Sequence, residues 1–208
     1  MPLRLNARNA AVLALVAALA GAGAIYGIGG GKGNAIACGN SFGKAAELAG
    51  LMRGDMAAMR PVRQPVAVGE LAFNDEAGRR HTLGSLAGKA LLLNLWATWC
   101  PPCRAEMPAL DALQKEMGGR RFEVVAVSVD LGSPDKPKRF YAETGIASLA
   151  FRHDGTMEIF NRLKRAGLGL GMPVSVLVDA EGCAVGVLNG PAEWASPAAI
   201  ALMGALAK

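Results

Sequence analysis

The chain has 208 residues, a hydrophobic fraction of 52% and a formal net charge of +5. Its mean hydropathy of +0.28 means that it has enough apolar side chains for a packed core, which excludes an intrinsically disordered protein. Four cysteines are too few for a disulfide-dense scaffold of this length. The length fits one domain of about 100–200 residues with an additional segment.

The N-terminal segment is apolar and carries no charged residue across positions 10–31. About 20 helical residues span a hydrocarbon core of roughly 30 Å, so we predict a transmembrane anchor at residues 10–30. Arg4 and Arg8 precede it, and the positive-inside rule therefore places residues 1–9 in the cytoplasm and the C-terminal domain in the periplasm. Without these arginines, 20 basic residues oppose 17 acidic ones, a net charge of +3. The basic residues form no cluster of the kind that binds nucleic acid.

Two other interpretations of this segment also export the domain. One is a cleaved signal peptide, with the small residues around Leu19-Ala20-Gly21-Ala22 as a peptidase site, although the apolar run exceeds the usual length of about 7–15 residues. The other is a lipoprotein, because Ala35-Ile36-Ala37 precedes Cys38, although residues 31–34 separate this cysteine from the apolar run. In each case the domain enters an oxidising compartment, where disulfides persist.

Residues 31–65 are predicted to form a linker and a docked helix. The Gly-rich residues 28–34 indicate a flexible linker. Residues 41–60 place apolar side chains at spacings of three and four, which predicts one amphipathic helix packed against the main domain. These side chains are Leu48, Leu51, Met52, Met56 and Met59. Pro61 and Pro65 then end the helix and begin an extended connector.

Residues 66–208 alternate between strands and helices. A turn containing Gly78 predicts a hairpin over residues 71–83. The apolar run at 90–96 predicts a strand buried on both faces, and a helix and a second buried strand complete a right-handed βαβ unit. The remaining predicted boundaries are helix 101–117, strand 122–130, helix 134–144, strand 148–152, helix 156–165, strands 174–179 and 184–188, and helix 197–207. The predicted class is therefore α/β, with a mixed sheet covered on both faces.

Two cysteines stand where the buried strand gives way to the first helix of this unit, in the sequence Cys100-Pro101-Pro102-Cys103. The free N–H groups and positive dipole end of a helix stabilise a thiolate, and prolines suit the first turn. Thiols separated by two residues can close a disulfide and transfer two electrons. Half of a zinc site is the alternative, but the other candidate ligands form no second closely spaced pair. Those ligands are Cys38, Cys183, His81 and His153.

The run Asn94–Pro108, NLWATWCPPCRAEMP, lies between Ser85–Lys89 and Gly171-Met172-Pro173. This combination resembles the membrane-anchored thioredoxin-like family typified by TlpA, which includes ResA and DsbE, and the resemblance covers about residues 66–207. It implies a thioredoxin fold with an N-terminal hairpin and a central βα insertion. It also implies a cis peptide bond before Pro173, packed against the dithiol. The implied activity is thiol:disulfide exchange, with the Cys100–Cys103 disulfide in place of any cofactor.

The resemblance assigns roles to individual residues. Cys100 matches the exposed attacking cysteine, and Cys103 matches the buried cysteine that resolves the mixed disulfide. Trp99 matches the flanking aromatic, with plain packing as the alternative, and Pro108 matches the proline that kinks the helix. Glu106 matches a carboxylate near the dithiol that takes the proton of Cys103, with an exposed helix carboxylate as the alternative.

Asn94 departs from the pattern of ordinary thioredoxins. They carry a buried Asp at this position, six residues before the first cysteine. Since the usual acid is missing, Glu106 becomes the expected proton partner of Cys103.

Cys38 and Cys183 remain as a pair in a compartment that permits disulfides. Cys183 lies in the turn between the last two predicted strands, which is a poor place for a catalytic thiol. We therefore predict a structural Cys38–Cys183 bridge that fastens the helix at 41–60 to the domain. Within the family, this extra bridge resembles TlpA in particular.

The resemblance implies a reductant whose dithiol receives electrons from a membrane thiol transporter of the DsbD or CcdA type. TlpA-like proteins reduce cysteines of copper chaperones and of the copper-site subunit of cytochrome oxidase. ResA- and DsbE-like proteins reduce apocytochrome c before haem attachment. Residues 167–173 are GLGLGMP, and they lack the GVYGAPET-like stretch of the DsbE type. This difference and the extra cysteine pair favour the first acceptor class.

A copper-binding chaperone of the Sco type is the alternative from another functional class. Such proteins share the fold but separate their cysteines by three residues and supply a later His ligand. The spacing here is two residues, and His153 follows a strand end, where we expect an exposed loop residue. An oxidant of the DsbA type would need a larger helical insertion than residues 133–165 allow.

Overall fold

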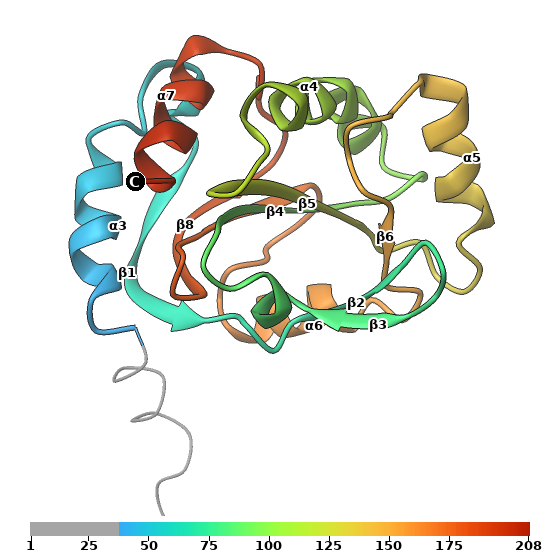
Figure 1. Ribbon diagram of the computed structural model, residues 1–208, viewed down its shortest axis with the longest axis horizontal. Coiled ribbons are helices and arrows are strands. Elements are labelled where there is room, and N and C mark those ends of the chain that lie inside the picture. The colour runs from blue at the N-terminus through green and yellow to red at the C-terminus, as the bar shows by residue number, and fades with distance from the viewer. Residues whose placement is uncertain (1–37) are drawn as a thin grey trace, which may run out of the picture.

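The computed structural model describes residues 38–208. The predicted anchor at 10–30 and the Gly-rich linker lie outside the described residues. In the described part, no helix combines the length and the apolar character needed to cross a membrane. Residues 38–208 build one sheet of eight strands with helices on both sides (Figure 1).

The sheet is mixed, with the strand order β1-β8-β7-β4-β5-β6-β2-β3. The strands are β1 (Arg60–Ala67), β2 (Ala72–Asp75), β3 (Arg80–Thr82), β4 (Ala90–Trp96), β5 (Phe122–Ser128), β6 (Arg152–His153), β7 (Val174–Val178) and β8 (Cys183–Asn189). β4, β5 and β6 run parallel, whereas the other neighbours pair antiparallel, including the predicted hairpin of β2 and β3. Every residue of β4 and β7 is buried, which explains their nearly continuous apolar sequences.

The helices cover this sheet from both sides. They are α3 (Ser41–Ala49), α4 (Pro101–Met117), α5 (Asp135–Thr144), α6 (Glu158–Arg165) and α7 (Pro197–Leu206), with 3-10 turns at Gly54–Met56 and Leu83–Leu86. Figure 1 shows α4 and α7 on one side of the sheet and α6 on the other. This arrangement confirms the predicted α/β class with a mixed central sheet.

The predicted helix over residues 41–60 is wrong in its extent, because α3 ends at Ala49. Gly50 follows it, and Gly54 adopts a left-handed φ of 58°, a conformation that glycine reaches without steric cost. The chain therefore turns within the predicted helix. The apolar pattern still predicted the buried side chains correctly, because Met56 and Met59 are buried after the turn and Leu48 is buried within α3.

The extended connector predicted after Pro61 is the edge strand β1 of the main sheet. It pairs with β8, and the register shifts between Pro61 and Val66. Proline lacks the N–H that a central strand must donate, so it is tolerated at edges and bulges such as this one. The sheet therefore begins inside the residues 31–65 that the sequence assigns to the linker.

A disulfide joins Cys38, which precedes α3, to Cys183, the first residue of β8 rather than part of the preceding turn. The two Cα atoms are 5.8 Å apart across a sequence separation of 145 residues. The bridge fastens the segment before α3 to the sheet, and α3 itself packs against β1, β8 and α7. Because the sulfur of Cys38 is bonded to that of Cys183, it is not free to carry the lipid that the lipoprotein interpretation requires.

The short strand predicted at 148–152 begins later, at Arg152. Oδ1 of Asp111 accepts hydrogen bonds from the backbone N–H groups of Ala147, Ser148 and Leu149. Because a side chain from α4 takes these donors, they do not enter a strand ladder.

Candidate active site

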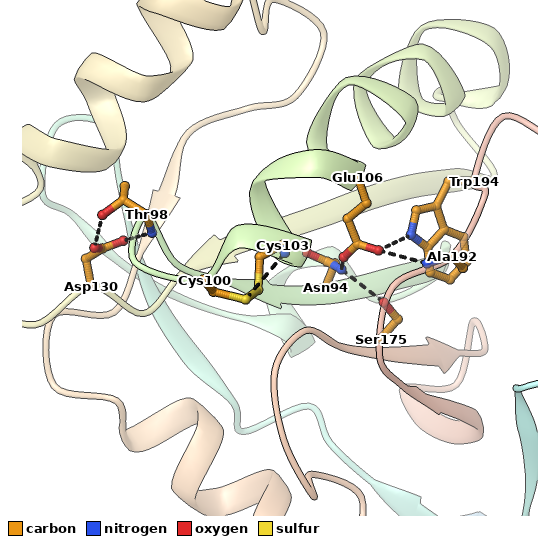
Figure 2. The surroundings of a disulfide bond; sticks show 9 residues. All are labelled: Asn94, Thr98, Cys100, Cys103, Glu106, Asp130, Ser175, Ala192 and Trp194. Atoms are coloured by element: carbon orange, nitrogen blue, oxygen red, sulfur yellow. Dashed lines mark hydrogen bonds between the residues drawn. A yellow bond between two sulfur atoms is a disulfide. The ribbon is translucent and has the colours of Figure 1, made fainter.

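Cys100 and Cys103 lie where β4 leads into α4 (Figure 2). They form a disulfide with their Cα atoms 5.3 Å apart. Cys100 is the N-cap of α4, and its Sγ accepts a hydrogen bond of 3.3 Å from the backbone N–H of Cys103. Both prolines occupy the first turn, where a missing N–H costs nothing.

The two sulfur-bearing residues differ in access. Cys103 is fully buried, whereas Cys100 keeps 5% of its surface exposed. Cys100 is therefore also largely buried, contrary to the prediction of an exposed cysteine, but it is the more accessible of the two. The N-terminus of α4 favours a thiolate on Cys100 because free N–H groups and the helix dipole stabilise negative charge there.

The loop before Cys100 is held by the carboxylate of Asp130, which no motif in the sequence marks. Asp130, just beyond β5, is buried and accepts hydrogen bonds from the backbone N–H of Thr98 at 2.9 Å and from its hydroxyl. It also accepts a hydrogen bond of 2.8 Å from the hydroxyl of Ser128. The sequence feature that could have identified Asp130 is an acidic residue just after a buried apolar strand.

We expect Asp130→Ala to lower the free energy of unfolding by about 2–4 kcal/mol, since buried donors on Thr98 and Ser128 lose a charged acceptor. The variant should also slow thiol–disulfide exchange, because the loop that carries Cys100 is no longer tied to β5. Guanidinium unfolding and exchange kinetics measure the two effects. Asp111→Ala is the matched control, since it removes a remote carboxylate with three N–H donors and should lower stability only. Equal exchange rates in both variants would contradict the prediction.

Glu106 is buried, with only 4% of its surface exposed, so the alternative of an exposed helix carboxylate is wrong. Oε1 accepts a hydrogen bond of 2.8 Å from Nδ2 of Asn94. Oε2 accepts one of 3.1 Å from the backbone N–H of Ala192 and one of 3.0 Å from Nε1 of Trp194. Figure 2 shows these donors converging on the carboxylate from two sides.

Burial away from water raises the pKa of Glu106 above its usual value of 4.5, although the hydrogen bonds from Asn94, Trp194 and Ala192 oppose this shift. Glu106 also lines an open pocket of about 420 Å³ beside Pro102 and Glu193. The carboxylate is therefore buried from the core side, yet a pocket connects its surroundings to solvent. A proton on this group can exchange through that pocket.

The raised pKa of Glu106 predicts how stability changes with pH. The folded state favours the protonated form more than the unfolded state does, so the contribution of Glu106 is fully present below about pH 4.5. It is lost as the pH rises through the folded-state pKa. Relative to Glu106→Gln, the wild-type protein should therefore lose unfolding free energy as the pH rises above about 4.5 and through the raised pKa of Glu106. Denaturant unfolding over this range measures the difference, and a pH-independent difference would refute the prediction.

Pro173 lies at the end of β4 from which the loop to Cys100 departs, because Leu95 pairs with Val174 in the antiparallel β4–β7 register. The Met172–Pro173 peptide bond is cis. The loop before it is fastened by Asn189, whose Oδ1 accepts a hydrogen bond of 2.7 Å from the backbone N–H of Leu170. This loop and the dithiol thus share one edge of the sheet.

Apolar side chains are exposed around the dithiol. Trp99 is 58% exposed, so its indole is not packed into the core. Leu131, next to Asp130, is 69% exposed, and Leu170, on the loop before Pro173, is 81% exposed. Isolated exposed apolar residues are ordinary, but three on the loops that border one reactive pair indicate a contact surface.

His153 corrects the expectation of an exposed loop residue. It is buried in β6, and its Nε2 lies 2.7 Å from the backbone carbonyl oxygen of Asp130. Among residues 38–208, no group of three His, Cys, Asp or Glu side chains is arranged to hold a metal ion. Its burial and its contact with Asp130 place the His153 ring in the packing between β5 and β6.

Sequence comparisons identify the family to which the chain belongs. The family model described as Redoxin matches residues 63–201. Thiol-disulfide oxidoreductase ResA of Geobacillus thermodenitrificans is 32% identical over 60% of this chain and 71% of its own length. Thioredoxin-like protein YneN of Bacillus subtilis is 41% identical over 33% of this chain and 40% of its own length.

Solved structures agree as well. A Chlorobium tepidum protein described as thiol:disulfide interchange protein DsbE superposes with a TM-score of 0.58 at 25% identity, covering 68% of this chain and 96% of its own. The fold is therefore the thioredoxin fold, and the close Cys100–Cys103 pair is its CxxC active site. The chain belongs to the redoxin family and is a thioredoxin-like thiol-disulfide oxidoreductase of the TlpA, ResA and DsbE type.

Proposed function

We propose that this protein is a membrane-anchored reductant of cysteine pairs in exported proteins, with its thioredoxin-like domain in the periplasm. The apolar segment at 10–30 and the two preceding arginines support the anchor and its orientation. The Cys38–Cys183 disulfide supports an oxidising compartment, because structural disulfides are rare in the cytosol.

The buried carboxylate of Glu106 is the observation that carries the direction of electron transfer. Glu106 follows Cys103 by three residues on α4, so the two side chains share one helix face. In its ionised form, Glu106 places a negative charge there that raises thiol pKa values and opposes the stabilisation of a thiolate by the helix N-terminus. A pair whose reduced form is strongly stabilised acts as an oxidant, so weakening that stabilisation favours a reductant.

The surface around Cys100 supports a protein as the substrate. Trp99, Leu131 and Leu170 are exposed on the loops at the same edge of the sheet as Cys100, which is itself only slightly exposed. An apolar partner surface can cover these side chains and bring its own disulfide to Cys100. We propose that a membrane thiol transporter of the DsbD or CcdA type reduces the pair from the same side.

For the electron acceptor, we propose the copper chaperone and the copper-site subunit of cytochrome oxidase. Their cysteines must be reduced before they bind metal. The Cys38–Cys183 bridge and the sequence at 167–173 support this class over apocytochrome c, which remains the alternative.

The reduction potential of the Cys100–Cys103 pair tests the direction. Equilibration of the domain with dithiothreitol or glutathione mixtures should give a potential below about −200 mV, as expected for a donor in an oxidising compartment. A value near about −120 mV, like that of a strong disulfide oxidant, would overturn the proposal.

A trapping variant tests the acceptor. Cys103→Ser leaves Cys100 able to attack but unable to release the mixed disulfide, so the partner stays attached. Mass spectrometry of the trapped species should identify a copper chaperone or an oxidase subunit. Apocytochrome c in the trap would instead support the alternative acceptor. The matched control is Cys100→Ser, which should trap neither.

A further inference from the structure

One polar atom of the site drawn in Figure 2 has no hydrogen-bond partner among the described residues. Asn94 is fully buried in β4, and its Oδ1 has no partner among residues 38–208. Its Nδ2 is fully used, donating to Oε1 of Glu106 at 2.8 Å and to the hydroxyl of Ser175 at 3.0 Å. A buried acceptor without a donor costs free energy, and such an atom in a folded protein calls for an explanation.

The orientation of the amide follows from its neighbour. Carboxylate oxygens only accept hydrogen bonds, so the NH₂ end of Asn94 faces Glu106 and the oxygen faces away from it. Figure 2 shows this oxygen on the side of Cys103 and the nitrogen on the side of Glu106 and Ser175. In the disulfide, the sulfur of Cys103 carries no hydrogen and has nothing to donate.

Reduction of the disulfide gives Cys103 a hydrogen-bond donor. Two electrons and two protons break the S–S bond and form an S–H group on each of Cys100 and Cys103. Cys103 is fully buried, so its new thiol donor cannot turn to water. A thiol is a weak donor, so it pairs best with an acceptor that no stronger donor already occupies.

We propose that Oδ1 of Asn94 accepts the hydrogen bond of the Cys103 thiol in the reduced protein. The unpartnered atom of the disulfide state is then the acceptor reserved for the dithiol state. One amide holds the Glu106 carboxylate through its nitrogen and the Cys103 thiol through its oxygen, which makes Asn94 a positioning residue. The inference holds for either direction of electron transfer and for any protein partner.

This role also gives a physical reason for an amide at position 94. An aspartate there would place a second carboxylate against Glu106 and remove the donor that Glu106 now has. The amide supplies an acceptor for Cys103 and a donor for Glu106 without adding charge. The hydroxyl of Ser175 accepts the second hydrogen bond of the same Nδ2.

Infrared spectroscopy of a single-thiol protein tests the hydrogen bond directly. In Cys100→Ser with the Cys38–Cys183 bridge intact, the S–H stretch reports Cys103 alone. Adding Asn94→Leu, of similar volume, should move this band to the position of a thiol without a hydrogen bond. Leu92→Ala is the matched control, because Leu92 is fully buried on the same face of β4 and should leave the band in place. A band that Asn94→Leu leaves unchanged would overturn the proposal.

A second variant separates this role from general disruption of the core. Asn94→Asp keeps an oxygen acceptor near Cys103 but loses the donor to Glu106. Its S–H band should stay at the hydrogen-bonded position, and a band at the free position in this variant would also overturn the proposal.

The redox equilibrium supplies an independent readout in the chain with both active-site cysteines. Asn94→Leu removes an acceptor that helps only the dithiol and an unpartnered atom that harms only the disulfide. Its equilibrium with dithiothreitol should therefore shift toward the disulfide by roughly tenfold, which corresponds to about 30 mV. Leu92→Ala should stay within about twofold of wild type, since it weakens both redox states alike. An unchanged equilibrium for Asn94→Leu, or a shift toward the dithiol, would reject the assignment.

Discussion

Replacing Cys100 with serine should abolish thiol–disulfide exchange, with a rate loss of about 10³-fold or more, as expected when a nucleophile is removed. The thiolate is the attacking species, and a serine hydroxyl does not ionise at neutral pH. Cys103 cannot take over the attack because it is fully buried. The rate of reduction of a disulfide-containing peptide measures the loss.

The partner variant Cys103→Ser should behave differently. It should still attack a disulfide but stop at the mixed disulfide, since no second thiol resolves it. A burst of one equivalent followed by no turnover is the expected time course. Equal residual turnover in the two variants would show that the cysteines have no distinct roles and would contradict the geometry at the start of α4.

Removing the Cys38–Cys183 bridge should lower the free energy of unfolding by about 4–5 kcal/mol, because the bridge closes a very long loop. The change to make is Cys38→Ala with Cys183→Ala, so that no unpaired thiol remains. Guanidinium unfolding with the active-site disulfide oxidised measures the loss. The physical cause is the larger conformational freedom of the unfolded chain once the loop is open.

The same double variant should keep its exchange rate under conditions where it is folded. The bridge joins the segment before α3 to β8, whereas the reactive pair lies at the start of α4. A stability loss below about 1 kcal/mol would show that α3 is held by packing alone. A strongly reduced exchange rate in the folded variant would show that the bridge shapes the active site.

Several features followed from the sequence because their signals are local. The apolar run at 90–96 and the cysteines beside two prolines predicted a buried strand, a helix start and a reactive pair. The hairpin of β2 and β3 was readable from its turn. The apolar spacing alone was misleading at the end of α3. It extended the predicted helix to residue 60, whereas the chain turns at Gly50 and Gly54.

Other features depend on contacts between distant parts of the chain. Glu106 is buried because Ala192 and Trp194 reach it from a loop that follows it by 86 and 88 residues. Asn94 meets Ser175 across 81 residues, and Asp130 meets Thr98 across 32. No helical or strand periodicity marks such partners.

By itself, the sequence determined where the thiols sit and which end of a helix activates them, because capping and burial patterns act over a few residues. Only the tertiary structure decided the surroundings of those thiols. It placed a buried carboxylate and an amide with an unused acceptor beside Cys103, and both depend on how β4, β7 and the loop before α7 pack together. Desolvation and hydrogen bonding are set by that packing, and they tune the chemistry of the dithiol.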